Sequence, residues 1–310
     1  MTSLPLTPDE SREVYLHLET TPLRLREIAV ATDFSDQATQ AVRIAAILAR
    51  QLNSSLHVLH VTSPIVDSAG AGTLASALQE IDLRNAEGRL SRYINRIPEA
   101  RSLKHEEIVV CDSVTEAIPA IVESKAIDLL VMGSYGRSGL GKLVLGSRAE
   151  NVIRHLSRPV LVAGPGCTGN FESTKSIVLA TDLIAGSLRA AQYATSLAES
   201  TGAKLTLIHA IADRAVKDTF SLEANKKSAI EQMLLLIPNT VESRTRSRFE
   251  VAIGNPAEQI LQIADERKAD LIVMGVREQE PMADHAPWAT LSEVIRRARC
   301  PVLAVRPHIA

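Results

Sequence analysis

The chain has 310 residues, of which 45% are apolar and 23% are charged. This composition is typical of a soluble globular protein of about two domains. Its 34 basic and 36 acidic side chains leave a net charge of −2, which excludes a global basic field that would recruit nucleic acid or anionic lipid.

Strands and helices are expected to alternate through the first half of the chain. Short apolar runs predict strands at Glu27–Thr32, Ser55–Val61, Glu107–Val110, Leu129–Met132 and Val160–Ala163. Helical spacing of apolar residues predicts a helix that opens at Ser35 and Asp36, and further helices over about 74–97 (ended by Pro98), 114–124 and 147–156. This alternation is typical of an α/β fold with a parallel sheet and helices on both faces.

The second half of the chain repeats the first. Ile28–Asp33 (IAVATD) recurs 149 residues later as Ile177–Asp182 (IVLATD), and Asp128–Gly133 recurs 142 residues later as Asp270–Gly275. The second copy predicts strands at Ser176–Thr181, Lys204–Ala210, Glu250–Ile253, Leu271–Met274 and Val302–Val305. We therefore expect one domain written twice. The expected boundaries are an extension at 1–24, domains at 25–165 and 176–308, and a linker at 166–175.

A glycine-rich segment follows the fourth predicted strand and leads into a helix near Ser147. Residues 131–148, VMGSYGRSGLGKLVLGSR, hold five of the fifteen glycines. Glycines let backbone N–H groups approach phosphate oxygens, and the start of a helix favours an anion. Arg137 and Lys142 could add positive charge, whereas glycines used only for turns are the alternative. The match of residues 136–142 to a P-loop is rejected, because Leu143 cannot bind Mg²⁺ and a P-loop follows the first strand.

The spacing Gly133-x2-Gly136-x9-Gly146-Ser147 resembles the nucleotide loop of universal stress proteins. Asp33 after the first strand and His60-Val61 at the end of the second are also similar to that family, and the resemblance covers most of residues 26–306 in both copies. It implies two tandem Rossmann-like (adenine nucleotide alpha hydrolase-like) domains, each with a five-stranded parallel sheet, and ATP as the ligand, with or without Mg²⁺.

The resemblance also implies which residues bind ATP. The adenosine would lie near Asp33, whose carboxylate can accept hydrogen bonds, and the phosphates would lie in the glycine loop. The implicated residues, with Arg137 added for its charge, are Ala31, Thr32, Asp33, Val61, Met132, Gly133, Gly136, Arg137, Gly146 and Ser147. A role for Asp33 as a helix N-cap is the alternative.

The second copy departs from this pattern in its loop. Asp182 and Gly275 remain, but Glu278 stands where Gly136 stood, and Trp288 and Ala289 replace Gly146 and Ser147. Residues 277–287 contain no glycine, and Glu278 and Glu280 would repel phosphate. We therefore expect one competent nucleotide site and one degenerate site.

No catalytic or metal-binding residues are predicted. His57 and His60 lie three apart in a strand and point to opposite faces, and His60 and His209 are expected to pack with satisfied rings. The glycine loop offers no evident general base. The leading hypothesis is an ATP-binding stress-response module that acts through nucleotide-dependent conformation or an unknown protein partner. A slow ATPase or adenylate-handling enzyme, and a scaffold with a vestigial nucleotide site, are the alternatives.

Three further expectations concern the surroundings of the protein. The cysteines, Cys111, Cys167 and Cys300, are odd in number and widely spaced, which favours a reducing cytoplasm and buried apolar packing. The start of the chain has no secretory apolar segment, and no run approaches the ~20 apolar residues of a membrane span. The resemblance also implies pairing through last strands, so Pro159–Ala163 and Pro301–Val305 could pair into an intramolecular pseudo-dimer, and a homodimer remains open.

Overall fold

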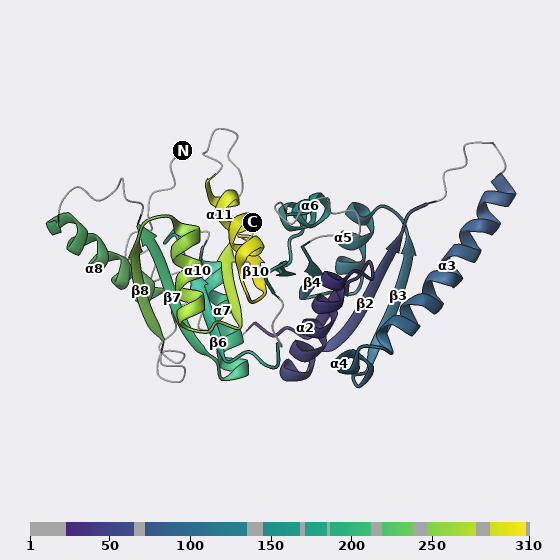
Figure 1. Cartoon of the computed structure of the whole chain (residues 1–310), viewed down its shortest axis with the longest axis horizontal. Coiled ribbons are helices and arrows are strands. Elements are labelled where there is room, and N and C mark those ends of the chain that lie inside the picture. Colours follow the sequence, from purple (N-terminus) through teal and green to yellow (C-terminus); the bar gives the residue numbers. More distant parts are fainter. Residues whose placement is uncertain are drawn as a thin grey trace. The chain divides into compact units, whose positions relative to one another are not determined.

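The computed structural model describes residues 23–64, 72–134, 145–167, 171–184, 187–211, 219–237, 247–276 and 286–307. The chain divides into two compact units, which we call domain 1 (Leu25–Ala163) and domain 2, which contains Gly164–Ala310 (Figure 1). Among the described residues, no helix combines the length and the apolar character needed to cross a membrane.

Domain 1 is a five-stranded parallel sheet with the strand order β3-β2-β1-β4-β5. Its elements are β1 (Glu27–Ala31), α2 (Asp36–Leu52), β2 (Ser55–Thr62), α3 (Gly72–Ile94), α4 (Pro98–Arg101), β3 (His105–Cys111), α5 (Val114–Ser124), β4 (Leu129–Gly133), α6 (Ser147–His155) and β5 (Val160–Ala163).

Domain 2 has the same topology, with the strand order β8-β7-β6-β9-β10 and parallel neighbours throughout. Its elements are β6 (Ser176–Ala180), α7 (Ser187–Thr201), β7 (Lys204–Ile211), α8 (Thr219–Leu235), β8 (Arg248–Ile253), α10 (Pro256–Glu266), β9 (Leu271–Gly275), α11 (Ala286–Arg297) and β10 (Val302–Val305). The predicted α/β fold with two parallel-sheet domains is confirmed.

The strand order of domain 1 reverses at β1, which pairs with β2 on one side and β4 on the other. Crossovers between parallel strands are right-handed. The reversal therefore sends α2 and α3 over one face of the sheet and α5 and α6 over the other. Open parallel sheets bind ligands at the carboxyl ends of their strands, beside such a reversal.

The core of domain 1 is aliphatic, as the scarcity of aromatic residues predicts. Ile28, Ala29 and Val30 of β1 are fully buried, as strands covered on both faces require. Ser35 is the N-cap of α2, and its side chain accepts a hydrogen bond from the Ala38 N–H at 3.2 Å. One boundary is wrong: α3 ends at Ile94, and Pro98 begins α4 because its fixed φ suits the first position of a helix.

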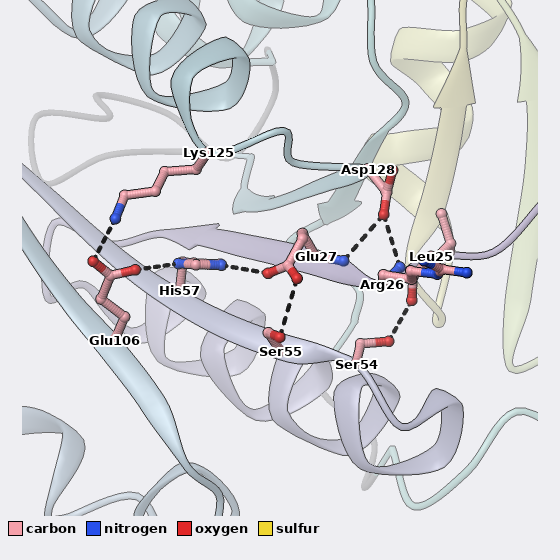
Figure 2. Close-up of polar contacts among 9 residues, drawn as sticks. All are labelled: Leu25, Arg26, Glu27, Ser54, Ser55, His57, Glu106, Lys125 and Asp128. Carbon is pink, nitrogen blue, oxygen red and sulfur yellow. Dashed lines mark hydrogen bonds and ion pairs between the residues drawn. The ribbon is translucent and has the colours of Figure 1, made fainter.

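An aspartate that recurs in both domains binds the main chain at the beginning of the domain's first strand. The Asp128 carboxylate accepts hydrogen bonds from the main-chain N–H groups of Arg26 (2.7 Å) and Glu27 (3.0 Å), as Figure 2 shows. Asp270 accepts the equivalent pair from Lys175 and Ser176. The recurrence of Asp in both copies therefore has a structural cause, which is to fix the first residues of β1 and β6.

Candidate nucleotide site at the carboxyl ends of β1, β2 and β4

Asp33 lies in the turn between β1 and α2. Its Oδ1 accepts a hydrogen bond from the Ser35 N–H at 3.0 Å, and the preceding Thr32 N–H donates to the Leu59 carbonyl at 2.8 Å. Phe34, between Asp33 and Ser35, has a left-handed φ of 66°. The N-cap of α2 is Ser35, so the alternative role of Asp33 as the cap does not apply. Asp33 is thus held at the end of β1, beside the start of a helix.

The end of β2 is tied to the end of β1 through His60, the neighbour of Val61. The His60 ring nitrogen Nδ1 donates to the Thr32 carbonyl at 2.8 Å, and its ring centroid lies 4.3 Å from that of Phe34. Domain 2 repeats the contact, with His209 Nδ1 at 3.0 Å from the Thr181 carbonyl. Both half-buried histidines thus bond a main-chain carbonyl through Nδ1, as expected of a structural role.

Helix α3 adds an aromatic cluster that the sequence analysis missed. The Tyr93 hydroxyl lies 2.9 Å from Thr39 Oγ1, its ring meets Phe34 edge-on at 5.1 Å, and the Arg89 guanidinium lies 4.1 Å from the Phe34 centroid. Burial raises the pKa of Tyr93, so it is a neutral phenol at neutral pH. The sequence feature that could have indicated this cluster is Phe34, an aromatic residue directly after Asp33 in a chain with few aromatics.

Gly133, the last residue of β4, lies against the first turn of α2. A Cβ at this position would be 3.1 Å from both the Ala38 nitrogen and Gln37 Cβ. Close packing between strand and helix therefore disfavours a side chain here, which gives this glycine of the predicted loop a structural role of its own. Met132 precedes it in β4 and is almost fully buried.

Ser134, the next residue, was not singled out from the sequence. It is 1% exposed, its N–H donates to the Ala163 carbonyl at 3.0 Å, and its carbonyl accepts from the Gly146 N–H at 2.9 Å. Within the described ranges its hydroxyl has no hydrogen-bond partner. A buried unpaired hydroxyl is costly, and a bound ligand is one way to satisfy it.

Helix α6 begins at Ser147, with Gly146 at the N-cap position. Gly146 has extended backbone angles and no side chain to accept a hydrogen bond from the first N–H groups of the helix. The first turn of α6 therefore presents donors and the positive end of the helix dipole next to Ser134. Two of the predicted site residues, Gly136 and Arg137, and also Lys142, lie outside the described residues.

Domain 2 repeats the histidine contact but differs at several of the other points. Asp182 accepts from the Ser187 hydroxyl at 2.5 Å, and Val276 occupies the position of Ser134 while keeping the main-chain bond, here to the Val305 carbonyl at 2.8 Å. Helix α11 begins at Ala286, so Trp288 lies inside the first turn of the helix, whereas Gly146 precedes α6. Glu278 and Glu280 lie outside the described residues.

Charged clusters elsewhere in the described residues do not point to a metal centre. In the described part of the chain, no group of three or more His, Cys, Asp or Glu side chains could hold a metal ion.

Comparisons with known proteins agree with this architecture. The family model of the Universal stress protein family matches the chain twice, over residues 24–164 and 173–306. A universal stress protein of Mycolicibacterium smegmatis is 25% identical over 91% of this chain and 97% of its own length. One of Thermus aquaticus is 35% identical and covers 44% of this chain with 97% of its own length.

Among solved structures, the crystal structure of a universal stress protein from Archaeoglobus fulgidus superimposes with a TM-score of 0.64 at 23% identity. It covers 92% of this chain and 97% of its own, and this likeness concerns the fold. Since the family matches both halves, the chain belongs to the universal stress protein family and carries two of its domains in tandem.

Proposed function

We propose that this protein binds ATP through domain 1 and acts in the cytoplasm as a stress-response module, by nucleotide-dependent conformation or by binding a protein partner. One observation carries the proposal: the uncapped start of α6 lies next to the buried, unpaired hydroxyl of Ser134, at the edge of the sheet where this fold binds ligands.

The phosphates of ATP would bind at the start of α6. The first-turn N–H groups that follow Gly146, and the hydroxyls of Ser134 and Ser147, can donate hydrogen bonds to phosphate oxygens. The glycine loop would add its backbone N–H groups near Gly133 and Gly136, and Arg137 its charge. Mg²⁺, if used, would accompany the phosphates as their counter-ion.

The adenosine would bind at the ends of β1 and β2. The Asp33 carboxylate can accept from the ribose hydroxyls or from the adenine amino group, and the main chain around Ala31, Thr32 and Val61 offers donors and acceptors for the base. The Ser35 N–H bond to Asp33 Oδ1 holds this carboxylate in place, so little ordering is needed on binding.

Domain 2 is proposed not to bind ATP. It keeps the fold and Asp182, but it replaces the hydroxyl of Ser134 with Val276 and the open helix start with Trp288 inside α11. An indole at that position occupies space that a phosphate would need, and valine offers no donor.

Isothermal titration calorimetry of the full chain with ATP tests the proposal. We expect about one ATP bound per chain, with binding abolished by Gly146→Trp, which introduces the residue of domain 2, and unchanged by the matched variant Trp288→Gly. Repeating the titration in EDTA shows whether Mg²⁺ contributes. Two equivalent sites per chain, or full binding by Gly146→Trp, would overturn the proposal.

A slow ATPase is the second candidate function. A hydrolase needs a general base that activates water, and the glycine loop where the phosphates are proposed to bind offers none that is evident from the sequence; His60, whose Nδ1 donates to the Thr32 carbonyl, lies at the proposed adenosine end instead. Phosphate release should therefore be slow, and it should fall to background in Gly136→Glu. Fast turnover that depends on the glycine loop would favour the enzyme, and absence of any nucleotide from the purified protein would favour a scaffold.

We also propose that the last strands of the two domains pair antiparallel into a pseudo-dimer within one chain. β5 and β10 are each the terminal strand of their own domain's sheet, and pairing would satisfy their outer backbone groups. Light scattering should then give the mass of one chain, or of two if chains associate further.

A further inference from the structure

A buried histidine bridges two carboxylates at the amino edge of the domain 1 sheet, at the opposite end of the strands from the nucleotide site. His57 of β2 is 8% exposed. Its Nε2 lies 2.7 Å from Glu27 Oε2 of β1, and its Nδ1 lies 2.8 Å from Glu106 Oε2 of β3 (Figure 2). These hydrogen bonds thus link β1, β2 and β3, which are neighbours in the sheet.

Both bonds can form fully only when the ring is protonated. An ionised carboxylate accepts and cannot donate, and a neutral imidazole carries a single N–H. The imidazolium carries an N–H on each nitrogen and can donate to Glu27 and Glu106 together. Loss of its proton leaves one carboxylate facing a nitrogen lone pair at hydrogen-bond distance.

The two carboxylates are themselves held in place. Lys125, at the end of α5, donates to Glu106 Oε1 at 2.6 Å, and the Ser55 hydroxyl donates to Glu27 Oε1 at 3.2 Å. The hydrogen bond from Lys125 lowers the pKa of Glu106, with a smaller contribution from His57, so this carboxylate stays ionised in mildly acidic solution.

Domain 2 shows that the fold does not need this bridge. The equivalent positions in the strand pairing are Ser176 in β6, Thr206 in β7 and Arg248 in β8, which cannot form an acid–imidazole–acid bridge. The two main-chain hydrogen bonds that Asp128 accepts, in contrast, have their full counterpart at Asp270. All three members of the bridge are therefore specific to one domain, the one that we propose binds ATP.

We propose that Glu27, His57 and Glu106 form a pH-sensitive clasp that ties together β1, β2 and β3 of domain 1 when His57 is protonated and loosens when His57 loses its proton. Two charged groups contact the ring, Glu27 from β1 and Glu106 from β3. Two more lie one bond further away: Lys125, at the end of α5, is paired with Glu106, and Asp128 binds the main chain at Glu27. His105 and Glu107, the next charged residues of β3, lie 3.4 Å from each other.

The clasp has an alkaline limit and an acidic limit. The folded state with the clasp closed holds a proton on His57, so the clasp is lost as the pH rises and the ring gives up that proton. For Glu106 the sign is opposite: its lowered pKa contributes stability that is lost only as the pH falls below the ordinary range of Glu, about 4.3. The clasp is closed between these limits.

Two measurements on the full chain test the clasp. The ¹⁵N shifts of the His57 ring at about pH 6 report its protonation directly, and we expect the imidazolium. Hydrogen exchange, corrected for intrinsic rates, should show protection of β1–β3 falling about tenfold between about pH 6 and pH 8, while β6–β8 of domain 2 serve as the internal reference.

The variants isolate the bridge from general effects of pH. His57→Thr, which introduces the residue that domain 2 uses, and Glu106→Gln should both remove the extra pH dependence of domain 1. The control Glu107→Gln, on the neighbouring position of β3, should keep it. A neutral His57 ring at about pH 6, or protection of β1–β3 that follows β6–β8 at every pH, would overturn the proposal.

Discussion

The buried hydroxyl of Ser134 connects the stability of domain 1 with the ATP binding that we propose for this domain. The side chain is 1% exposed, and in the described part of the chain its oxygen has no hydrogen-bond partner. Val276 stands at the equivalent position of domain 2 and keeps the same main-chain bond, so the backbone there does not depend on a hydroxyl. The substitution Ser134→Ala, which removes only this hydroxyl, therefore tests its role.

The size of the effect can be worked out from that environment. Burying a hydroxyl without a partner costs about 1–3 kcal/mol, and removing a γ-oxygen leaves only a small void. We therefore expect Ser134→Ala to raise the free energy of unfolding of ATP-free domain 1 by about 1 kcal/mol. If the hydroxyl donates to a phosphate of ATP, the lost hydrogen bond should weaken binding by about tenfold, equivalent to about 1.4 kcal/mol.

Urea unfolding with and without ATP, together with calorimetric titration, measures both quantities for wild type and Ser134→Ala. Val276→Ala serves as the matched control, since it should lower the stability of domain 2 by a cavity term and leave ATP affinity unchanged. A variant that is less stable than wild type without ATP, and that binds ATP equally well, would refute the reasoning about this hydroxyl.

The remaining predictions concern parts of the fold outside the proposed nucleotide site. Asp128→Ala should destabilise domain 1, and Asp270→Ala should destabilise domain 2, each by about 2–3 kcal/mol, because two main-chain N–H groups lose a charged acceptor. Domain-resolved hydrogen exchange measures this, and a variant that leaves its own domain unchanged would contradict it. Burial, with a smaller contribution from Cys167, raises the pKa of Cys300 to about 12. The native protein at about pH 8 should therefore react with a thiol reagent first at the partly exposed Cys111, and labelling of Cys300 before Cys111 would contradict the burial argument.

Much of the fold could be read from the pattern of residues. The ten strands were predicted in number and order, with ends that shift by one or two residues, because parallel strands buried on both faces leave near-continuous apolar runs such as that at Ile28. The helix start at Ser35 followed from capping chemistry. The end of α3 was misplaced because Pro98 was taken only as a terminator, although proline also starts helices.

The candidate site was predicted in part. Its spacing of glycines and its aspartate are local features of the sequence, so Asp33, Gly133 and Gly146 could be named in advance. Ser134 and Tyr93 could not, since a buried unpaired hydroxyl and a cluster between β1, β2 and α3 depend on packing between segments that are far apart in the chain.

The sequence by itself determined the duplication, the parallel α/β architecture and the family, because all three are carried by periodicity and by short motifs repeated at fixed offsets. Only the tertiary structure decided that His57 lies between Glu27 and Glu106, residues 30 and 49 positions away. Strand pairing sets that neighbourhood, and the register that brings three strands together cannot be read from any one of them.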